Sequence, residues 1–272
     1  MSADDGAVMF EQRDHVAWIT INRPEHKNVM NPEVLLGLAD AWAEVRSDDA
    51  IRVAVVTASG DDDFCCGGDL GGLIPLWTRA KEPTTEVERR LLDRPQIIDD
   101  VMLKAEPLAK PVIAAVNGRA LGGGLELIQA TDIRIAADNA EFGLPEPKSG
   151  VVPGAGSMVR LARQLPYAHA MRIFLGGEPI DAATALAMGL VSEVVPSAEL
   201  LARTARVAAN VAAQAPLALQ AIKRTVMETH TLPWGEAFDV EKREAGGVMR
   251  SQDAREGPRA FKERREPTFE GR

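Results

Sequence analysis

The sequence predicts an α/β fold followed by a mostly helical C-terminal part, and three observations lead to that prediction. Short, continuously apolar runs recur along the first 196 residues. Helical patterns separate these runs, and from residue 197 onward only helical patterns follow one another. Apolar runs of this kind are typical of strands covered on both faces by helices. We therefore expect an α/β core over residues 1–196 and a helical C-terminal region over residues 197–272.

The predicted core begins with a strand and a helix. Residues 15–24, HVAWITINRP, contain β-branched residues in partial alternation and end at a turn, which predicts a strand. A helix is predicted over residues 31–48. Asn31 is a good N-cap, Pro32 suits the first turn, and Glu33 favours the positive end of the helix dipole. Apolar side chains continue the pattern at helical spacing, namely Leu35, Leu38, Ala39, Trp42 and Val45.

The rest of the chain is divided by the same criteria. Four buried strands are predicted, over residues 52–60, 111–118, 132–138 and 190–196. The charged stretch 71–110 predicts helices with mobile ends that could form a wall or lid over a site. Its bulky residues Leu73, Ile74, Leu76 and Trp77 could line that site or belong to the helix core. Helices are predicted over residues 197–216 and 217–230, with a third ending near residue 249.

Charge and composition set aside several kinds of partner. The formal net charge of −9 argues against nucleic acid. Cys65 and Cys66 are adjacent and cannot form an ordinary disulfide clamp, so a reducing compartment is expected. The acidic N-terminus does not resemble a signal peptide, and no apolar run approaches the roughly 18 residues of a spanning helix. We expect a cytoplasmic protein that binds neither nucleic acid nor a membrane.

Familiar metal and phosphate motifs are also missing from the sequence. The histidines are scattered, at positions 15, 26, 169 and 230, without the spacing of zinc ligands, so no metal site is predicted. There is no P-loop and no nucleophile elbow. Residues 154–160, GAGSMVR, start like a dinucleotide fingerprint but lack the rest of it, and they predict a helix N-terminus instead.

Two glycine-rich turns remain as candidates for chemistry. The first contains Gly67 and Gly68 in FCCGGDL, and the second contains the triplet 122–124 in ALGGGLEL. Each follows a predicted strand and precedes a predicted helix. Glycine allows a ligand to approach the backbone closely, and a helix N-terminus presents free N–H groups. Two such N–H groups directed at one point would form an oxyanion hole. The alternative is a pair of tight turns without a ligand.

Two carboxylates accompany these turns. Glu126 lies two residues after the triplet, and Glu146 lies between Pro145 and Pro147, where helix and central strand are both disfavoured. Two carboxylates that share a water can perform paired acid–base chemistry. The alternatives are that Glu126 is simply favoured by the helix dipole and that Glu146 is an exposed loop acid.

Several stretches together resemble the crotonase family, the enoyl-CoA hydratase/isomerase superfamily, over nearly the whole chain. They are INRPEHKNVMN, FCCGGDL, KPVIAAVNGRALGGGLEL, DIRIAADNAEFGLPEPKSGVVPGAG, MGLVSEVVP and EGPRAFKERREPTF. The resemblance implies a spiral of ββα units followed by a helical trimerisation region. It also implies a homo-oligomer, either a trimer or a dimer of trimers. The substrate would be an acyl-CoA thioester, and no separate cofactor is expected because coenzyme A is part of that substrate.

The resemblance also assigns roles to individual residues. The oxyanion amides would be those of Gly68 and Gly123, and the two hydratase glutamates would be Glu126 and Glu146. The presence of both acids favours addition of water to a 2-enoyl thioester. An enoyl-CoA isomerase, a dehydratase of the same fold, or a non-catalytic acyl-CoA or RNA-binding relative remain alternatives. The resemblance favours Glu146 as the proton donor to C2, but the sequence leaves the two roles open.

Further residues are candidate substrate contacts. In the first turn these are Gly67, Asp69 and Leu70, together with Cys66, which is interpreted as a small filler of the CoA pocket rather than a nucleophile. The others are Lys27 and Gly122 near the same pocket, and Phe261 and Arg264, which would touch the nucleotide of a neighbouring subunit's ligand. The basic residues among them could equally be ordinary surface charges.

Overall fold

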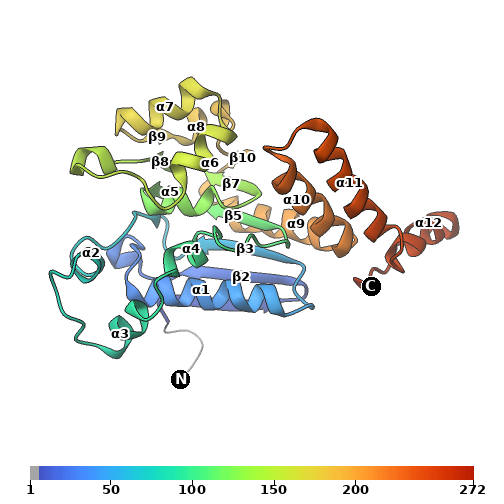
Figure 1. Ribbon diagram of the computed structural model, residues 1–272, viewed down its shortest axis with the longest axis horizontal. Helices are drawn as coiled ribbons and strands as arrows, with labels where there is room; N and C mark the ends of the chain where they lie inside the picture. Colours follow the sequence, from blue (N-terminus) through green and yellow to red (C-terminus); the bar gives the residue numbers. More distant parts are fainter. Residues whose placement is uncertain (1–5) are drawn as a thin grey trace.

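The computed structural model describes residues 6–272 and confirms the α/β fold class (Figure 1). The main sheet has six strands in the order β1-β2-β3-β5-β7-β10. Their bounds are β1 Val8–Arg13, β2 Val16–Ile21, β3 Val53–Ala58, β5 Val112–Val116, β7 Ile133–Ala137 and β10 Glu193–Val195. Only β1 is antiparallel to its neighbour, and the other pairs are parallel. The five predicted strands are all present, whereas β1 was not predicted.

Both faces of this sheet are buried, as its continuously apolar strands require. In β3, Val53 and Val55 face a cluster that includes Leu200 and Ala208 of α9 (Leu200–Ala212). The alternate residues of the strand face the larger core against α1 (Pro32–Ser47). The predicted start of α1 is confirmed, because the Asn31 side chain accepts a hydrogen bond of 3.0 Å from the Val34 N–H.

A second, smaller sheet carries the candidate site. It has the order β4-β6-β8-β9, with bounds β4 Asp63–Cys65, β6 Arg119–Leu121, β8 Glu141–Gly143 and β9 Ile180–Asp181. The elements that follow these strands are α5 (Gly123–Ile128), the 3₁₀ turn η2 (Glu146–Ser149), α6 (Ser157–Gln164), α7 (Tyr167–Gly176) and α8 (Ala182–Met188). The predicted helix N-terminus in GAGSMVR is therefore confirmed. The second sheet was not predicted.

The charged stretch 71–110 forms three short helices, as expected. They are α2 (Leu73–Trp77), α3 (Glu86–Leu92) and α4 (Ile97–Val101). The bulky residues of α2 divide between the two alternatives left open by the sequence. Leu73 and Leu76 are buried in the core, whereas Ile74 and Trp77 are more than a third exposed. Ile74 and Trp77 are thus open to solvent, and the buried Leu73 lies beside the first glycine turn, 3.8 Å from a Cβ placed on Gly68.

The C-terminal region is helical, as predicted. After the 3₁₀ turn η3 (Ser197–Glu199) and α9, it contains α10 (Pro216–Thr229), α11 (Trp234–Val248) and α12 (Asp253–Glu263). In Figure 1, α11 and α12 extend away from the core on the side opposite α2 and α3. The last helix, α12, was not predicted. Within residues 6–272, no helix is both long and apolar enough to cross a membrane.

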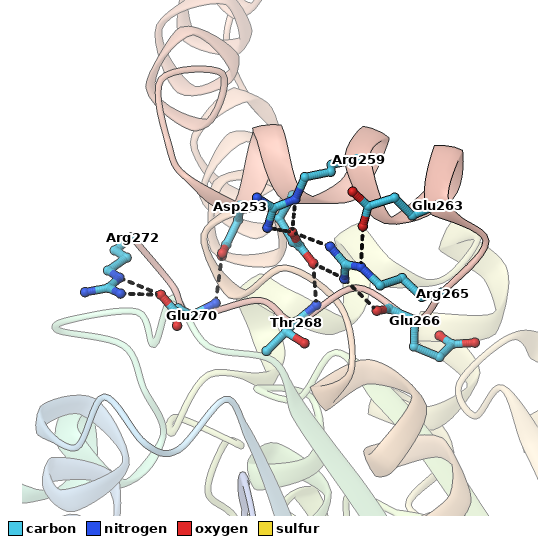
Figure 2. Close-up of polar contacts among 9 residues, drawn as sticks. Asp253, Arg259, Glu263, Arg265, Glu266, Thr268, Glu270 and Arg272 are labelled. Carbon is cyan, nitrogen blue, oxygen red and sulfur yellow. Dashed lines mark hydrogen bonds and ion pairs between the residues drawn. The ribbon is translucent and has the colours of Figure 1, made fainter.

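The last residues of the chain fold back onto α12 (Figure 2). Glu256 accepts hydrogen bonds from Arg265 at 2.5 Å and from the Thr268 N–H at 3.0 Å, and it also pairs with Arg259. Asp253 accepts the N–H groups of residues 270 and 271 at 2.8 and 2.9 Å. Both carboxylates are nearly buried. The tail is thus tied to the helix by charge-assisted hydrogen bonds, which are the stronger kind.

Candidate active site

The two glycine turns lie against each other. They follow β4 and β6, which are adjacent parallel strands, so their C-terminal ends meet. A Cβ placed on Gly123 would lie 3.6 Å from the Cα of Gly67, and one placed on Gly67 would lie 3.5 Å from the Gly123 nitrogen. The turns that the sequence separates by more than fifty residues therefore form one backbone surface.

Sterics explain why the second turn consists of glycines. A Cβ on Gly124 would lie 2.0 Å from the carbonyl oxygen of Cys65, so α5 could not pack on β4 with any side chain there. Gly122 has φ 53° and ψ −124°, a conformation that side chains disfavour. Its Cβ would also approach the Glu146 Oε1 to 2.9 Å. The glycine triplet therefore allows β4 to pack closely against Gly124 and the Glu146 side chain to pack closely against Gly122.

The amides of Gly68 and Gly123 are the candidate oxyanion donors. The first turn is held by its neighbours: the Met30 N–H donates to Gly67 O at 2.8 Å, and the Asp69 N–H donates to Met30 O at 2.9 Å. Gly123 is the first residue of α5, where the N–H has no acceptor within the helix. Among residues 6–272, neither candidate N–H has a hydrogen-bond acceptor. Both groups are thus free to bind a ligand oxygen.

Glu126 lies on α5 and is almost completely buried, with 3% of its surface exposed. Its Oε1 accepts the Ser157 N–H at 3.1 Å, and the Ser157 hydroxyl and the Ala155 N–H lie near the same carboxylate. Burial raises the pKa of Glu126, and these donors together with Lys104 oppose that rise. Burial outweighs these opposing groups, so the pKa of Glu126 lies above the ordinary glutamate value.

Glu146 is the first residue of the 3₁₀ turn η2, where Pro145 precedes it and Pro147 follows it. Its Oε2 is buried and has no hydrogen-bond partner among residues 6–272. Burial raises the pKa of Glu146 and the charge of Glu126 raises it further, while its own N–H opposes the shift. The two predicted acids are therefore close enough to interact, and Glu146 has fewer donors to keep it ionised.

Lys27 and Cys66 are also adjacent, as predicted. The Cys66 N–H donates to Lys27 O at 3.2 Å, and the Cys66 thiol donates to Asp63 Oδ1 at 3.0 Å. Burial and that hydrogen bond raise the pKa of the Cys66 thiol to about 12, which disfavours a nucleophilic thiolate. Asp63 in turn forms a two-point ion pair with Arg119, at 2.7 and 3.0 Å. This pairing anchors the base of the first turn.

Asn28 is a residue that the sequence analysis missed. It is fully buried, and its side-chain nitrogen donates to Ser59 O at 3.0 Å and Asp63 O at 2.7 Å. Its Oδ1 accepts the Arg23 N–H at 2.8 Å. Lys27 and Asn28 both have positive φ, at 54° and 51°. Asparagine tolerates a left-handed backbone, so the lysine–asparagine pair before a helix was the only sequence signal for this tight turn.

The other predicted contacts are distributed differently. Asp69 accepts the Gly71 and Gly72 N–H groups at 3.0 and 2.9 Å, so its carboxylate shapes the turn before α2. Leu70 is 73% exposed. Phe261 is 87% exposed at the end of α12, far from α5 in the single chain (Figure 1). Arg264, the cap of the same helix, is likewise not brought to the glutamates.

Three residues near Glu126, namely Ser157, Gln129 and Arg160, were not assigned to the site from the sequence. Ser157 is fully buried, and the Gln129 side chain, which is 2% exposed, donates to the Ser157 hydroxyl oxygen. Arg160, on the next turn of α6, donates to Met102 O at 2.7 Å and Leu103 O at 2.9 Å. The serine at a helix N-terminus was the only sequence signal, since first-turn N–H groups need an external acceptor.

The site offers backbone donors for a developing negative charge and two interacting carboxylates for proton transfer. Such donors stabilise an enolate-like oxygen, and the acids can move protons to and from the adjacent carbons. Within the described part of the chain, no group of three or more His, Cys, Asp or Glu side chains could hold a metal ion. The geometry fits acid–base chemistry next to a polarised carbonyl.

Comparison with known proteins agrees with this chemistry. Residues 11–272 match the enoyl-CoA hydratase/isomerase family. The enoyl-CoA hydratase EchA19 of Mycobacterium tuberculosis is 40% identical over 97% of this chain and 96% of its own length. The (E)-benzylidenesuccinyl-CoA hydratase of Thauera aromatica is 39% identical over 97% of this chain and 99% of its own. A crystal structure of enoyl-CoA hydratase from Bacillus anthracis superposes with a TM-score of 0.87 at 33% identity, covering 97% and 99% of the two chains.

Proposed function

Since the chain belongs to the enoyl-CoA hydratase/isomerase family, we propose that it adds water to trans-2-enoyl-CoA thioesters and forms 3-hydroxyacyl-CoA. The observation that supports this reaction is the pairing of Glu126 and Glu146 beside two backbone N–H groups that have no acceptor within residues 6–272. The hydratases named among the relatives support it as well. Coenzyme A would enter as part of the substrate, and no separate cofactor is proposed.

The backbone of the two turns would act on the thioester carbonyl. Its oxygen would accept the N–H groups of Gly68 and Gly123, which lack other acceptors in the described chain. As the nucleophile adds to C3, negative charge grows on that oxygen, and fixed N–H dipoles stabilise it without reorganising. Removal of one such donor typically costs about 10²- to 10³-fold in rate. Because glycine has no side chain, the thioester could reach these N–H groups at both turns.

The two carboxylates would move the protons. Water forms a bond to C3 while Glu126 takes one of its protons, and Glu146 donates a proton to C2 as the enolate collapses. Glu126 suits the role of base because the hydrogen bond from the Ser157 N–H, together with the nearby Ala155 N–H and Ser157 hydroxyl, favours its ionised form. Glu146 suits the role of acid because burial and the charge of Glu126 raise its pKa. One proton then returns from Glu126 to Glu146, so the net reaction consumes one water.

The experiment that tests this function follows the loss of enoyl-thioester absorbance over a panel of trans-2-enoyl-CoAs of increasing length. Glu146→Gln should reduce the rate by roughly 10²- to 10⁴-fold. Glu141→Gln is the matched control, because Glu141 is an exposed acid five residues earlier on β8. Rapid loss that only the first variant abolishes would support hydration. No loss across the panel, with CoA esters still bound, would contradict it.

An enoyl-CoA isomerase or a dehydratase working in the opposite direction is the second candidate. The family includes isomerases by name, and the carnitinyl-CoA dehydratase of Salmonella is 34% identical over 93% of this chain. Product analysis separates the reactions, because only hydration incorporates solvent oxygen at C3. A shifted double bond without oxygen incorporation would favour the isomerase.

The binding of CoA would extend beyond one chain. Lys27, Cys66, Gly67, Asp69, Leu70 and Gly122 would line the pocket, and Phe261 and Arg264 would reach a neighbouring subunit's nucleotide. Phe261 is 87% exposed in the single chain, so its side chain is accessible to a neighbouring subunit's ligand. We propose a cytoplasmic homotrimer or dimer of trimers. Sedimentation equilibrium would test it, and a monomer at micromolar concentration would contradict it.

A further inference from the structure

We infer that Ser157 and Gln129 are positioning residues for Glu126, linked to it in a three-member hydrogen-bond chain that fixes the carboxylate where it accepts a proton from the attacking water. This inference rests on the proposed function and extends it to two residues outside the glycine turns. Both act through Glu126.

The hydrogen bonds of the chain have a defined direction. The Gln129 side-chain nitrogen donates to Ser157 Oγ at 2.8 Å. A serine hydroxyl has a single proton, and because the amide already supplies a donor to its oxygen, that proton is available for Glu126. The Ser157 N–H donates to Glu126 Oε1 at 3.1 Å, and the Ser157 hydroxyl also lies beside that carboxylate and opposes the rise of its pKa. In the inferred chain, the hydroxyl proton points to Glu126, so one residue presents both an N–H and a hydroxyl to the carboxylate.

The chain is held in place by two helices. Glu126 lies on α5 and Gln129 directly follows it, one turn further on, whereas Ser157 begins α6. The Gln164 side chain, at the other end of α6, donates to Gln129 O at 2.9 Å. Both ends of α6 are therefore fastened to the same segment. With every member buried, the carboxylate has little freedom to rotate.

The charges around Glu126 make the donors important. Lys104 and Arg160 attract its charge from the segment after α4 and from α6, while Glu146 repels it from η2. Lys104 also pairs with Asp99 at 2.6 Å, and Arg160 donates to two carbonyls. On the strands β4 and β6 beneath α5, Asp63 and Arg119 pair with each other. Burial raises the pKa of Glu126, so the loss of a donor would leave less of the ionised base at neutral pH.

The first test is Ser157→Ala, which removes the hydroxyl but keeps the N–H. Loss of one hydrogen bond to a charged group should lower kcat roughly tenfold at neutral pH, with a smaller change in KM. The acidic limb of the kcat–pH profile should move to higher pH, because a less stabilised carboxylate holds its proton more strongly. Gln129→Met, which keeps the length of the side chain, should shift that limb in the same direction by less.

A control and a double variant distinguish positioning from general damage. Thr57→Val removes another buried hydroxyl, one that donates to Ala115 O at 2.9 Å in the main sheet, and it should leave the pH profile in place. The double variant of Ser157 and Gln129 should equal Ser157→Ala alone, since both act through one hydroxyl. An unmoved acidic limb, or additive losses, would overturn the inference. A Gln129→Met shift toward lower pH would do so too, because it would show the amide competing with Glu126 for the serine proton.

An infrared titration keeps this test independent of turnover. The carboxylic acid band of Glu126 is identified by difference against Glu126→Gln, and its midpoint is then compared between the parent and Ser157→Ala. A higher midpoint in the variant supports the hydrogen-bond chain, and an equal midpoint refutes it. If the parent hydrates no enoyl-CoA, the proposed function fails, while the infrared midpoints still decide the role of Ser157.

Discussion

Gly122→Ala is expected to damage catalysis more than stability. The added Cβ would lie 2.9 Å from Glu146 Oε1, inside ordinary van der Waals contact. The carboxylate would have to retreat by roughly half an ångström. A displacement of about 1 Å at a catalytic group can cost about 10²-fold, so we expect kcat to fall by roughly ten- to hundredfold with a smaller change in KM.

The same variant also carries a backbone cost. Gly122 has φ 53°, and such conformations cost a side chain about 1–2 kcal/mol. For a chain of this size that corresponds to a fall in Tm of about 2–8 °C. Gly189→Ala is the matched control. Its φ is 80° and nothing lies within 4 Å of the added Cβ, so it carries strain without the steric push.

Enoyl-thioester absorbance and thermal unfolding measure the two effects separately. Gly189→Ala should lower Tm and leave kcat in place, whereas Gly122→Ala should lower both. Equal kcat values for the two variants would refute the reasoning. In a Glu146→Gln background, Gly122→Ala should cost little further activity. A full additional loss would assign the damage to the Gly123 amide instead of Glu146.

Three further outcomes are expected. Gly124→Ala should prevent folding or lower the free energy of unfolding by more than about 4 kcal/mol, because its Cβ would lie 2.0 Å from Cys65 O. Gly176→Ala is the control: it has open space around the added Cβ, so it should be neutral or stabilising by up to about 1 kcal/mol in denaturant unfolding. Glu146→Gln should raise Tm at pH 7. A glutamate whose pKa is higher in the folded than in the unfolded protein destabilises the folded state once the pH exceeds its pKa in the unfolded chain, and the variant removes that effect. That gain should vanish below about pH 4, and a constant gain at all pH values would contradict it. Alkylation of Cys66 at neutral pH, followed by mass spectrometry, should be slow in the folded protein and fast after unfolding, because its thiol pKa is raised to about 12; equal rates would show that the thiol is not protected.

Local patterns explain how much of the fold could be predicted. The start of α1 at Asn31 and the buried strands β3 and β5 depend on neighbours in sequence, so caps and apolar runs revealed them. The strands of the second sheet have only two or three residues, too few to show a period. The helix α12 contains Pro258 in its interior, which disfavours a helix in any local reading.

The candidate site divides in the same way. Glu126 and the glycines beside it could be found because they share one short motif. The prediction that they perform hydration came from a family resemblance, and their individual roles stay predictions. Ser157 could not be assigned, because its contact with Glu126 joins residues 31 positions apart. That contact exists only once α6 has packed on α5, and a single sequence contains no sign of such long-range pairing.

The folded-back tail has a consequence for assembly. The carboxylates of Asp253 and Glu256 already order residues 265–272 within one chain, and Arg52 of the core adds a hydrogen bond of 2.6 Å to Phe269 O. Ordering the backbone of one residue costs about 1–2 kcal/mol of conformational entropy. When residues become ordered only on binding, that cost opposes association. In the proposed oligomer, that ordering would precede any encounter between subunits. The end of α12 would then be preorganised, with Phe261 and Arg264 already presented to a neighbouring subunit.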